Sequence, residues 1–112
     1  MKERKKEAVI PRLSHLQFAV LEILGTATMR GKDLRKRLSE RGINKSGPAF
    51  YQMMARAEEA KFVEGWYEQQ IIEGQIIKER HYRITGHGID AFQETKEFYS
   101  RPAQMAGMPA FA

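Results

Sequence analysis

The sequence contains no cysteine, so neither a disulfide scaffold nor a cysteine-ligated metal site is available to it. It has no apolar run near the roughly 18 residues that a membrane-spanning helix needs, and no membrane partner is expected. The basic stretch 1–6 leads into no apolar segment, so we expect a cytoplasmic rather than a secreted protein. A chain of 112 residues is expected to form one domain with a modest core, which a second copy would help to stabilise.

Groups that carry enzyme chemistry are also scarce. The three histidines, His15, His81 and His87, are scattered, and none is spaced with a carboxylate as metal ligands are. No nucleophile stands in a recognisable pattern with a base, and the glycines are too dispersed for a phosphate-binding loop. We therefore expect no catalytic residue, no metal and no cofactor.

Positive charge is what the sequence has in excess. The net charge is +5, and the isoelectric point is about 9.6. Two segments concentrate it: residues 1–12 hold five basic and two acidic side chains, a net +3, and residues 30–41 hold six and two, a net +4. The rest of the chain carries −2. Clustered positive charge attracts polyanions, so this distribution favours a nucleic-acid partner.

Local signals predict two helices before residue 45. Ser14 and Gln17 have the spacing of a capping box, and the apolar residues that follow predict a largely buried helix that ends near Leu24. A second helix is predicted over residues 31–41, where two leucines form a narrow apolar stripe and Gly42 serves as the C-terminal cap.

A third helix is predicted from the Ser46 cap to about Ala60, with Pro48 tolerated in its first turn. Helical spacing assigns one set of side chains to the core and another to the opposite face. The expected core set is Phe50, Met53, Met54, Ala57 and Ala60, and the expected outward set is Ala49, Gln52, Arg56 and Glu59.

The second half of the chain predicts a β-hairpin and a last helix. Residues 62–72 and 75–84 are rich in β-branched and aromatic residues and are separated by Glu73-Gly74, which is typical of a hairpin. Thr85 is placed to cap a fourth helix. Three helices, a hairpin and a further helix indicate a mostly α fold with a small β-hairpin, that is, a winged helix-turn-helix with a C-terminal dimerisation helix.

This fold divides the chain into four expected parts. Residues 1–11 form a basic N-terminal arm, 12–85 the winged helix-turn-helix domain, 86–100 the dimerisation helix and 101–112 a flexible tail. The fourth helix has apolar residues on two stripes, and the second stripe needs a partner beyond the domain's own core. The residues expected at the dimer contact are Ile89, Phe92, Phe98 and Tyr99.

In a helix-turn-helix, the second helix enters the major groove of double-stranded DNA. Gln52 can read adenine and Arg56 can read guanine, while the small Ala49 permits close approach. The other expected DNA contacts, mainly to phosphate, are Arg30, Lys32, Lys45, Ser46 and Tyr51, with Lys78 and Arg80 near the hairpin tip. The alternative from pattern alone is a small helical bundle whose charged face is only solvated.

The segment 51–58, which reads Tyr-Gln-Met-Met-Ala-Arg-Ala-Glu, resembles the Tyr-x-x-Leu-x-Arg-Leu-Glu core of PadR-type transcriptional regulators. Phe-Val-Glu at 62–64 and Tyr-Arg-Ile-Thr-Gly-His-Gly at 82–88 resemble further motifs of that family, as do residues 13–24 and 31–34. The resemblance covers about residues 13–99. It implies a winged helix, a homodimer paired through its C-terminal helix, and a transcriptional repressor.

The sequence departs from the family at two places. Lys61 stands where the family usually has glycine, which costs about 1 kcal/mol if that position is left-handed. The hairpin, residues 62–84, holds three basic and four acidic side chains, a net −1, which weakens the case for its contact with DNA.

The isoleucines that flank the hairpin tip have two interpretations: a small hairpin cluster or an exposed patch that meets a partner. They are Ile71, Ile72, Ile76 and Ile77. With the acidic hairpin, they support an alternative function, a winged-helix module that binds protein rather than DNA. Trp66 and Tyr67 suggest a third alternative, a regulator that stacks a small aromatic effector, although packing in the core or on the sheet is the favoured explanation for them.

Overall fold

The computed structural model describes residues 12–106, with side chains described through residue 100. The elements follow the predicted order, with one short strand added. They are α1 (His15–Leu24), β1 (Met29–Arg30), α2 (Gly31–Glu40), α3 (Gly47–Glu59), β2 (Val63–Ile72), β3 (Gln75–Ile84) and α4 (Gly86–Ala106). The fold is therefore mostly helical with a small antiparallel sheet, as predicted, and it is a winged helix.

The predicted starts of α1 and α3 are confirmed because their signals are local. Ser14 and Gln17 form both hydrogen bonds of the capping box at the start of α1. The Ser46 side chain accepts a hydrogen bond from the Ala49 amide at 3.2 Å and begins α3. Gly42, after α2, has φ of 86°, a left-handed conformation that glycine adopts without steric cost.

The sheet has the strand order β1-β3-β2 and is antiparallel. The turn between β2 and β3 has positive φ at both central residues, 51° at Glu73 and 81° at Gly74, as a type I′ hairpin turn requires. Strand β1 was not expected; its residues Met29 and Arg30 pair with Tyr82 and His81 and join the start of α2 to the hairpin.

The core lies between α1, α2, α3 and the inner end of the hairpin. Its fully buried large side chains are Val20, Leu24, Leu34, Leu38, Phe50, Met54 and Tyr82. Tyr82 reaches the core because β3 passes directly beside the start of α2, where a Cβ on Gly31 would lie 3.2 Å from its ring. The inner end of the hairpin is thereby fixed to the helical body.

Two positions explain how the chain turns around the hairpin. Lys61 has φ of 69°, so the position after α3 is left-handed and is occupied by lysine where the family usually has glycine. Thr85 accepts a hydrogen bond from the Gly88 amide at 2.9 Å and donates to the Lys61 carbonyl, which ties α4 to the end of α3. A side chain at Gly88 would collide with the Phe62 carbonyl oxygen.

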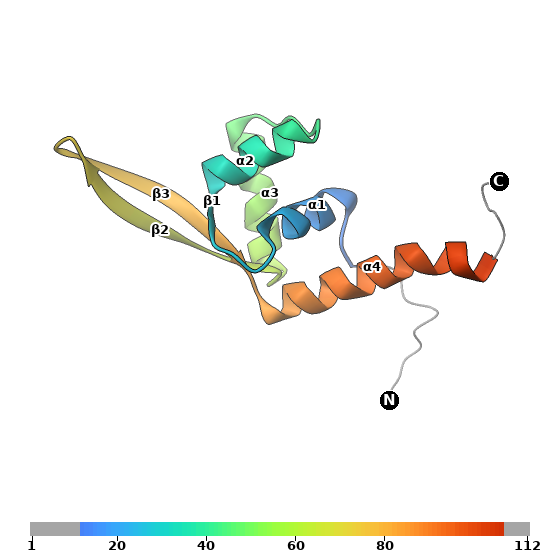
Figure 1. The fold of residues 1–112 in the computed structure, drawn as a ribbon. Helices are drawn as coiled ribbons and strands as arrows, with labels where there is room; N and C mark the ends of the chain where they lie inside the picture. Colours follow the sequence, from blue (N-terminus) through green and yellow to red (C-terminus); the bar gives the residue numbers. More distant parts are fainter. Residues whose placement is uncertain (1–11, 107–112) are drawn as a thin grey trace.

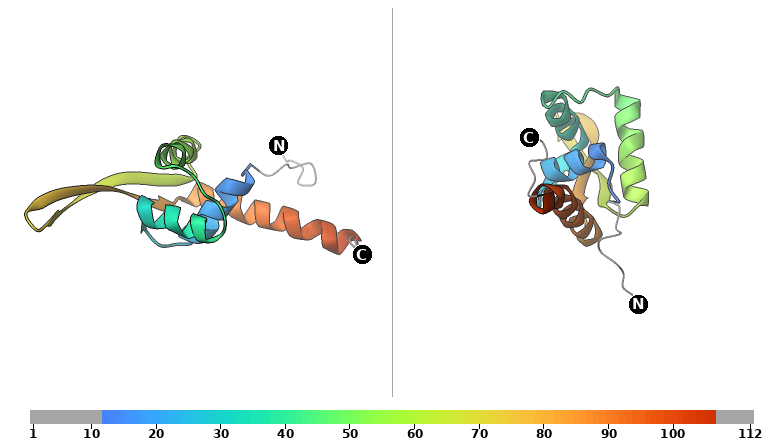
Figure 2. Two further views of the ribbon diagram at one scale, coloured as in Figure 1. Left: turned by 90° about the horizontal axis from the view of Figure 1, so that it is seen from above. Right: turned by 90° about the vertical axis from the view of Figure 1, so that its right-hand side faces the viewer.

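The hairpin and α4 project from opposite sides of the helical body, the hairpin on the left of Figure 1 and α4 on the right (Figure 1, and Figure 2 from above). Helix α4 continues to Ala106, so the predicted end of this helix at residue 100 is wrong. Pro102 explains the error, because proline usually ends a helix. The predicted basic arm, 1–11, and the last part of the predicted tail, 107–112, lie outside the described residues.

Candidate nucleic-acid interface

The exposed face of α3 holds the side chains expected to read bases. Gln52 and Arg56 are exposed, Ala49 is half-buried, and the Tyr51 side chain is 39% exposed. Tyr51 packs with one edge toward the ring of Phe50 and leans over the start of α2. The face is kept open because Phe50, Met54 and Ala57 point the other way, into the core.

One residue of α3 was assigned to the wrong side. Ala60 was expected in the core but is exposed, because α3 ends at Glu59 and Ala60 is already its C-terminal cap. The exposed face also includes Ala55, which the sequence prediction did not place there. Ala55 lies one turn beyond Tyr51, so the helical period could have found it.

Beside the first turn of α3 lies a hollow of about 530 Å³ that is lined mostly by basic side chains. The basic lining residues are Arg30, Lys32, Arg35, Lys36 and Lys45. Among the described residues that line it, only Asp33 is acidic, which leaves a net charge of +4. We call this surface the α2–α3 surface. It brings together four residues expected at phosphate, Arg30, Lys32, Lys45 and Tyr51.

The sequence prediction missed two members of this surface, Arg35 and Lys36. They follow Lys32 at the i+3 and i+4 positions of α2, a spacing that puts all three on one side of a helix. Arg35 also donates a hydrogen bond to the Lys45 carbonyl at 2.9 Å, which holds the turn between α2 and α3 against α2. The turn therefore presents Lys45 beside the N-terminus of α3.

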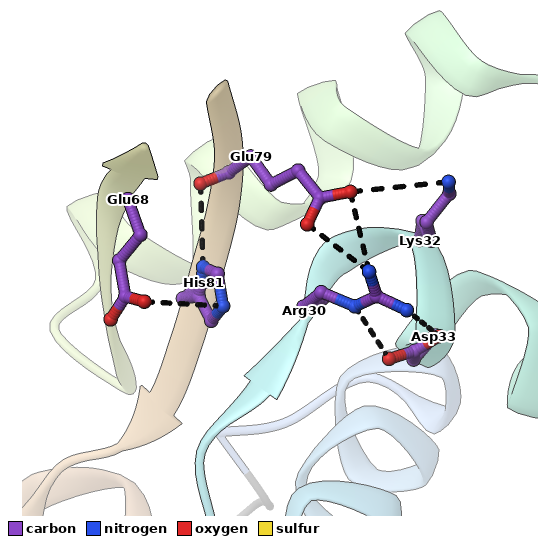
Figure 3. A network of polar contacts seen from close by, with 6 residues as sticks. All are labelled: Arg30, Lys32, Asp33, Glu68, Glu79 and His81. Carbon is purple, nitrogen blue, oxygen red and sulfur yellow. Dashed lines mark hydrogen bonds and ion pairs between the residues drawn. The ribbon is translucent and has the colours of Figure 1, made fainter. Parts of the chain in front are cut away.

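Arg30 is held by two carboxylates (Figure 3). Its Nε lies 2.9 Å from Asp33, and its Nη1 lies 3.2 Å from Glu79 on β3. Hydrogen bonds from Arg30 hold the pKa of the Asp33 carboxyl below its usual range. The pKa of Arg30 is raised, mainly by its hydrogen bonds to Asp33 and to a smaller extent by those to Glu79. Lys32 stands 3.9 Å from the same Glu79.

The basic residues of the hairpin are also paired within the chain. Arg80 forms an ion pair with Glu58 of α3 at 2.7 Å. Burial lowers the pKa of Arg80, but the Glu58 charge and the hydrogen bonding of Arg80 to Tyr82 and Glu58 outweigh burial and raise that pKa overall. Lys78 and Arg80 both lie over the ring of Tyr67, at 5.2 Å and 4.7 Å from its centroid.

The two aromatic residues at the start of β2 lie on opposite faces of the hairpin. Trp66 is half-buried, stacks on His81 with ring centroids 6.2 Å apart, and donates to Glu68 at 3.0 Å. Packing on the sheet therefore accounts for Trp66. Packing on the sheet does not account for Tyr67, because its side chain is 60% exposed and lies beneath the charged groups of Lys78 and Arg80.

The isoleucines of the hairpin tip form no buried cluster. The exposed fractions are 75% for Ile71, 49% for Ile72 and 67% for Ile76, and Ile77 is half-buried. The exposed-patch interpretation describes them better than the hairpin cluster does.

Helix α4 divides the residues expected at a dimer contact into two groups. Phe92 is half-buried and stacks on Phe18 of α1 with ring centroids 4.7 Å apart, so this side chain is used within the chain. Ile89, Phe98 and Tyr99 are exposed by 40%, 37% and 49%. Tyr99 also stacks on His15 at 5.7 Å.

The part of the chain that the structure describes offers no cluster of three or more acidic or histidine side chains that could hold a metal ion. Within residues 12–106, no helix is both long and apolar enough to cross a membrane.

Solved structures of transcription regulators share this fold. A PadR-family regulator from Clostridium difficile R20291 matches with a TM-score of 0.68 and 17% identity over 83% of this chain and 95% of that one. A PadR-family regulator from Eggerthella lenta DSM 2243 matches with a TM-score of 0.63 and 23% identity over 82% of this chain and 78% of that one. Bacillus subtilis PadR, solved in complex with operator DNA, matches with a TM-score of 0.60 and 16% identity over 74% of this chain and 47% of that one. No protein-family model and no curated sequence matches the chain.

Proposed function

We propose that this protein is a PadR-type transcription regulator that binds specific double-stranded DNA. Helix α3 lies in a major groove with Gln52 and Arg56 toward the base edges, and the α2–α3 surface contacts the flanking phosphates. The observation that carries the proposal is the net charge of +4 on the lining of that surface, beside the Ser46-capped N-terminus of α3. Cationic side chains and helix N-termini are the groups that proteins use to contact phosphate.

The fold supports this proposal because PadR-family regulators share it, and one of them has been solved with operator DNA. The ion pairs of Arg30 and Lys32 do not oppose it, since a pair with an exposed cation is worth little and can exchange a carboxylate for a phosphate. A repressor is the form of regulator that the resemblance to PadR implies.

A homodimer paired through α4 is part of the proposal. Ala91, Thr95 and Phe98 are spaced to share one face of α4. The first two are fully buried on the domain, while Phe98 and the adjacent Tyr99 are exposed further along the helix. The C-terminal end of α4 projects past the helical body (Figure 1). A second copy would cover the exposed end of this stripe, and its twofold symmetry would match a palindromic DNA site.

Sedimentation of Phe98→Glu tests the dimer. A charge in the seam should shift the wild-type dimer toward monomer, whereas the matched control Gln93→Glu, on an exposed and polar part of α4, should not. A wild type that is monomeric at tens of micromolar, an assumed working concentration, would contradict the dimer. Equal sedimentation of both variants as folded dimers would place the seam elsewhere.

The alternative function is a winged-helix module that binds protein. The exposed isoleucines of the hairpin tip and the paired charges at its inner end favour this alternative. Selection of bound sequences from a random DNA pool, followed by a mobility-shift assay across salt concentrations, separates the two. A regulator yields a common sequence and binding that weakens as salt rises; a protein-binding module yields neither.

A further inference from the structure

The outer half of the hairpin, residues 69–78, has one face with a distinct composition. Ile71 lies directly opposite Ile76, with Gln69 opposite Lys78 two positions inward and Tyr67 opposite Arg80 beyond them. Residues opposite one another in an antiparallel pair share a face, and so do residues two apart along a strand. These six side chains therefore form one stripe, aliphatic at the tip and polar or cationic inward. We call it the inner wing face.

This face continues from the exposed side of α3. Tyr67 and Arg80 line one groove together with Tyr51, Ala55 and Glu58 of α3, and the groove has a volume of about 760 Å³. The Arg80–Glu58 ion pair fixes the hairpin against the helix at this point. A nucleic acid that contacts α3 would therefore meet the inner wing face next.

The reach of the hairpin fits the spacing of DNA grooves. From Gly65 and Tyr82, where the hairpin joins the body, six residues of strand lead to Ile71 and Ile76. Six residues extend about 20 Å at roughly 3.3 Å per residue. Adjacent major and minor grooves are about half a helical turn apart, which is about 17 Å. With α3 in a major groove, the tip reaches the neighbouring minor groove.

Charge and size suit DNA better than a protein partner. The outer half of the hairpin holds one acid, Glu73, and one base, Lys78, so the net −1 of the whole hairpin resides nearer the body. Each face of the tip has only two isoleucines. The surface of two side chains is far smaller than the roughly 800 Å² per partner that a stable protein interface buries. Two aliphatic side chains at the end of an arm are enough for a wedge between base pairs.

We propose that Ile71 and Ile76 form an apolar wedge that enters the minor groove beside the major groove occupied by α3, and bends the DNA there. Gln69 would meet minor-groove acceptors and Lys78 a phosphate, while the wedge partly unstacks one base step. A flexible pyrimidine–purine step is the preferred site because it unstacks at the lowest cost. This inference rests on the proposed function and adds a second site of sequence preference to it.

The test uses the full chain and a DNA fragment selected from a random pool. The bend is measured from the end-to-end distance of doubly labelled DNA, and the affinity is measured on the same fragment. The variant is Ile71→Thr with Ile76→Thr, because threonine keeps the β-branch that favours a strand while losing apolar surface. The control is Ile72→Thr with Ile77→Thr, the two isoleucines of the opposite face, which lie diagonally to one another because Ile72 faces Gln75 and Ile77 faces Gln70.

Wild type is expected to bend the fragment by at least about 20°. The inner-face variant should lose most of this bend, while its affinity falls by less than about tenfold because the cost of unstacking disappears with the wedge. Repeated selection with this variant should no longer favour a pyrimidine–purine step at the wing position. The control variant should match wild type in all three measurements.

Several results would overturn the wedge. Specific binding by wild type without a bend, or equal loss of bend in the variant and its control, would remove it while leaving the proposed function intact. A change in sedimentation of the inner-face variant without DNA would assign the tip to a contact between copies. Failure of wild type to select any DNA would overturn both the wedge and the proposed function.

Discussion

The α2–α3 surface and the hairpin both carry basic side chains, but what faces those side chains differs. On the α2–α3 surface, Arg30 and Lys32 face Glu79, but Arg35, Lys36 and Lys45 form no ion pair with a described acidic residue, and the hollow that they line is open to a polyanion. At the inner end of the hairpin, Arg80 faces Glu58 and Arg83 faces Glu64, each at less than 3 Å. The net charge of a segment is therefore a poor guide to its partner; the pairing of each charge decides what it can bind.

The hairpin itself repeats this lesson on a smaller scale. Its net −1 suggests a surface that repels DNA, yet its acids nearer the body have partners within the chain. Glu64 pairs with Arg83, Glu79 pairs with Arg30, and Glu68 accepts a hydrogen bond from Trp66. The outer half is neutral and aliphatic. The two halves of one hairpin thus have different chemistry, which a sum over residues 62–84 conceals.

The largest expected effect compares the same residue type in the two regions. Gln52→Ala removes a base contact from α3, and we expect DNA binding to weaken by about 1–3 kcal/mol with relaxed preference at one base position. Gln70→Ala, on the hairpin face opposite to the inner wing face, should change neither the DNA affinity nor the base preference. Selected binding sites and affinities measure both. Arg56→Ala should act as Gln52→Ala does; unchanged preference in both α3 variants would remove α3 from base reading.

A second comparison concerns how firmly the hairpin is joined to the body. Burial raises the pKa of Tyr82 to about 12, and Arg80 opposes part of that rise. The folded pKa lies above the unfolded value of about 10, so the neutral phenol stabilises the fold below pH 10, and this contribution is lost as pH rises through 12. The free energy of unfolding should fall by about 2 kcal/mol more over that interval in wild type than in Tyr82→Phe. Urea titrations at pH 9 and pH 12 measure it, and parallel pH profiles would contradict a buried phenol.

A third test addresses the connection between α3 and the hairpin. Lys61 holds a left-handed conformation at φ of 69°, which glycine adopts without steric cost. Lys61→Gly should therefore raise the free energy of unfolding by about 1 kcal/mol. Lys61→Ala removes the same charge without relieving the backbone and serves as the control. Thermal or urea unfolding compares them, and a destabilised Lys61→Gly would mean that this strain is absent.

The smallest expected effect comes from removing the carboxylate that links the two regions. Glu79 of the hairpin faces Arg30 and Lys32 of the α2–α3 surface. Glu79→Gln frees Lys32 and removes one of the two carboxylates that hold Arg30, so DNA affinity should rise by up to about fivefold, the scale of a surface ion pair. Glu64→Gln removes the same charge where it faces only Arg83, and its effect should be smaller. Mobility shifts at one salt concentration measure both; equal gains would mean that only net charge matters.

The sequence predicts the elements well because the signals that begin and end them are local. The Ser14 capping box, the Ser46 cap and the Glu73-Gly74 turn each act within four residues, and the structure has all of them. Pairings across long distances are not visible in this way. Arg30 and Glu79 are 49 residues apart, and their contact depends on β1, a strand of two residues with no pattern of its own.

The candidate site is predicted less completely than the fold for the same reason. Gln52 and Arg56 follow from the helical period alone, and both are exposed as expected. The α2–α3 hollow forms only when the turn at Lys45 folds back on Arg35 of α2. The sequence does not show this contact, so it does not show which basic residues of α2 belong to the site. The exposure of the tip isoleucines likewise depends on how far the hairpin extends beyond the body.

Salt dependence tests the difference between the two regions most directly. Wild type, Lys36→Ala and Arg83→Ala are titrated with the selected DNA at several salt concentrations, and log affinity is plotted against log salt. Lys36 lines the α2–α3 hollow, whereas Arg83 is paired with Glu64. We predict that Lys36→Ala reduces the slope by about 0.9 for each phosphate that the protein no longer neutralises, while Arg83→Ala leaves it unchanged. An unchanged slope for Lys36→Ala, or an equal reduction for Arg83→Ala, would contradict the assignment of phosphate contacts to the α2–α3 surface.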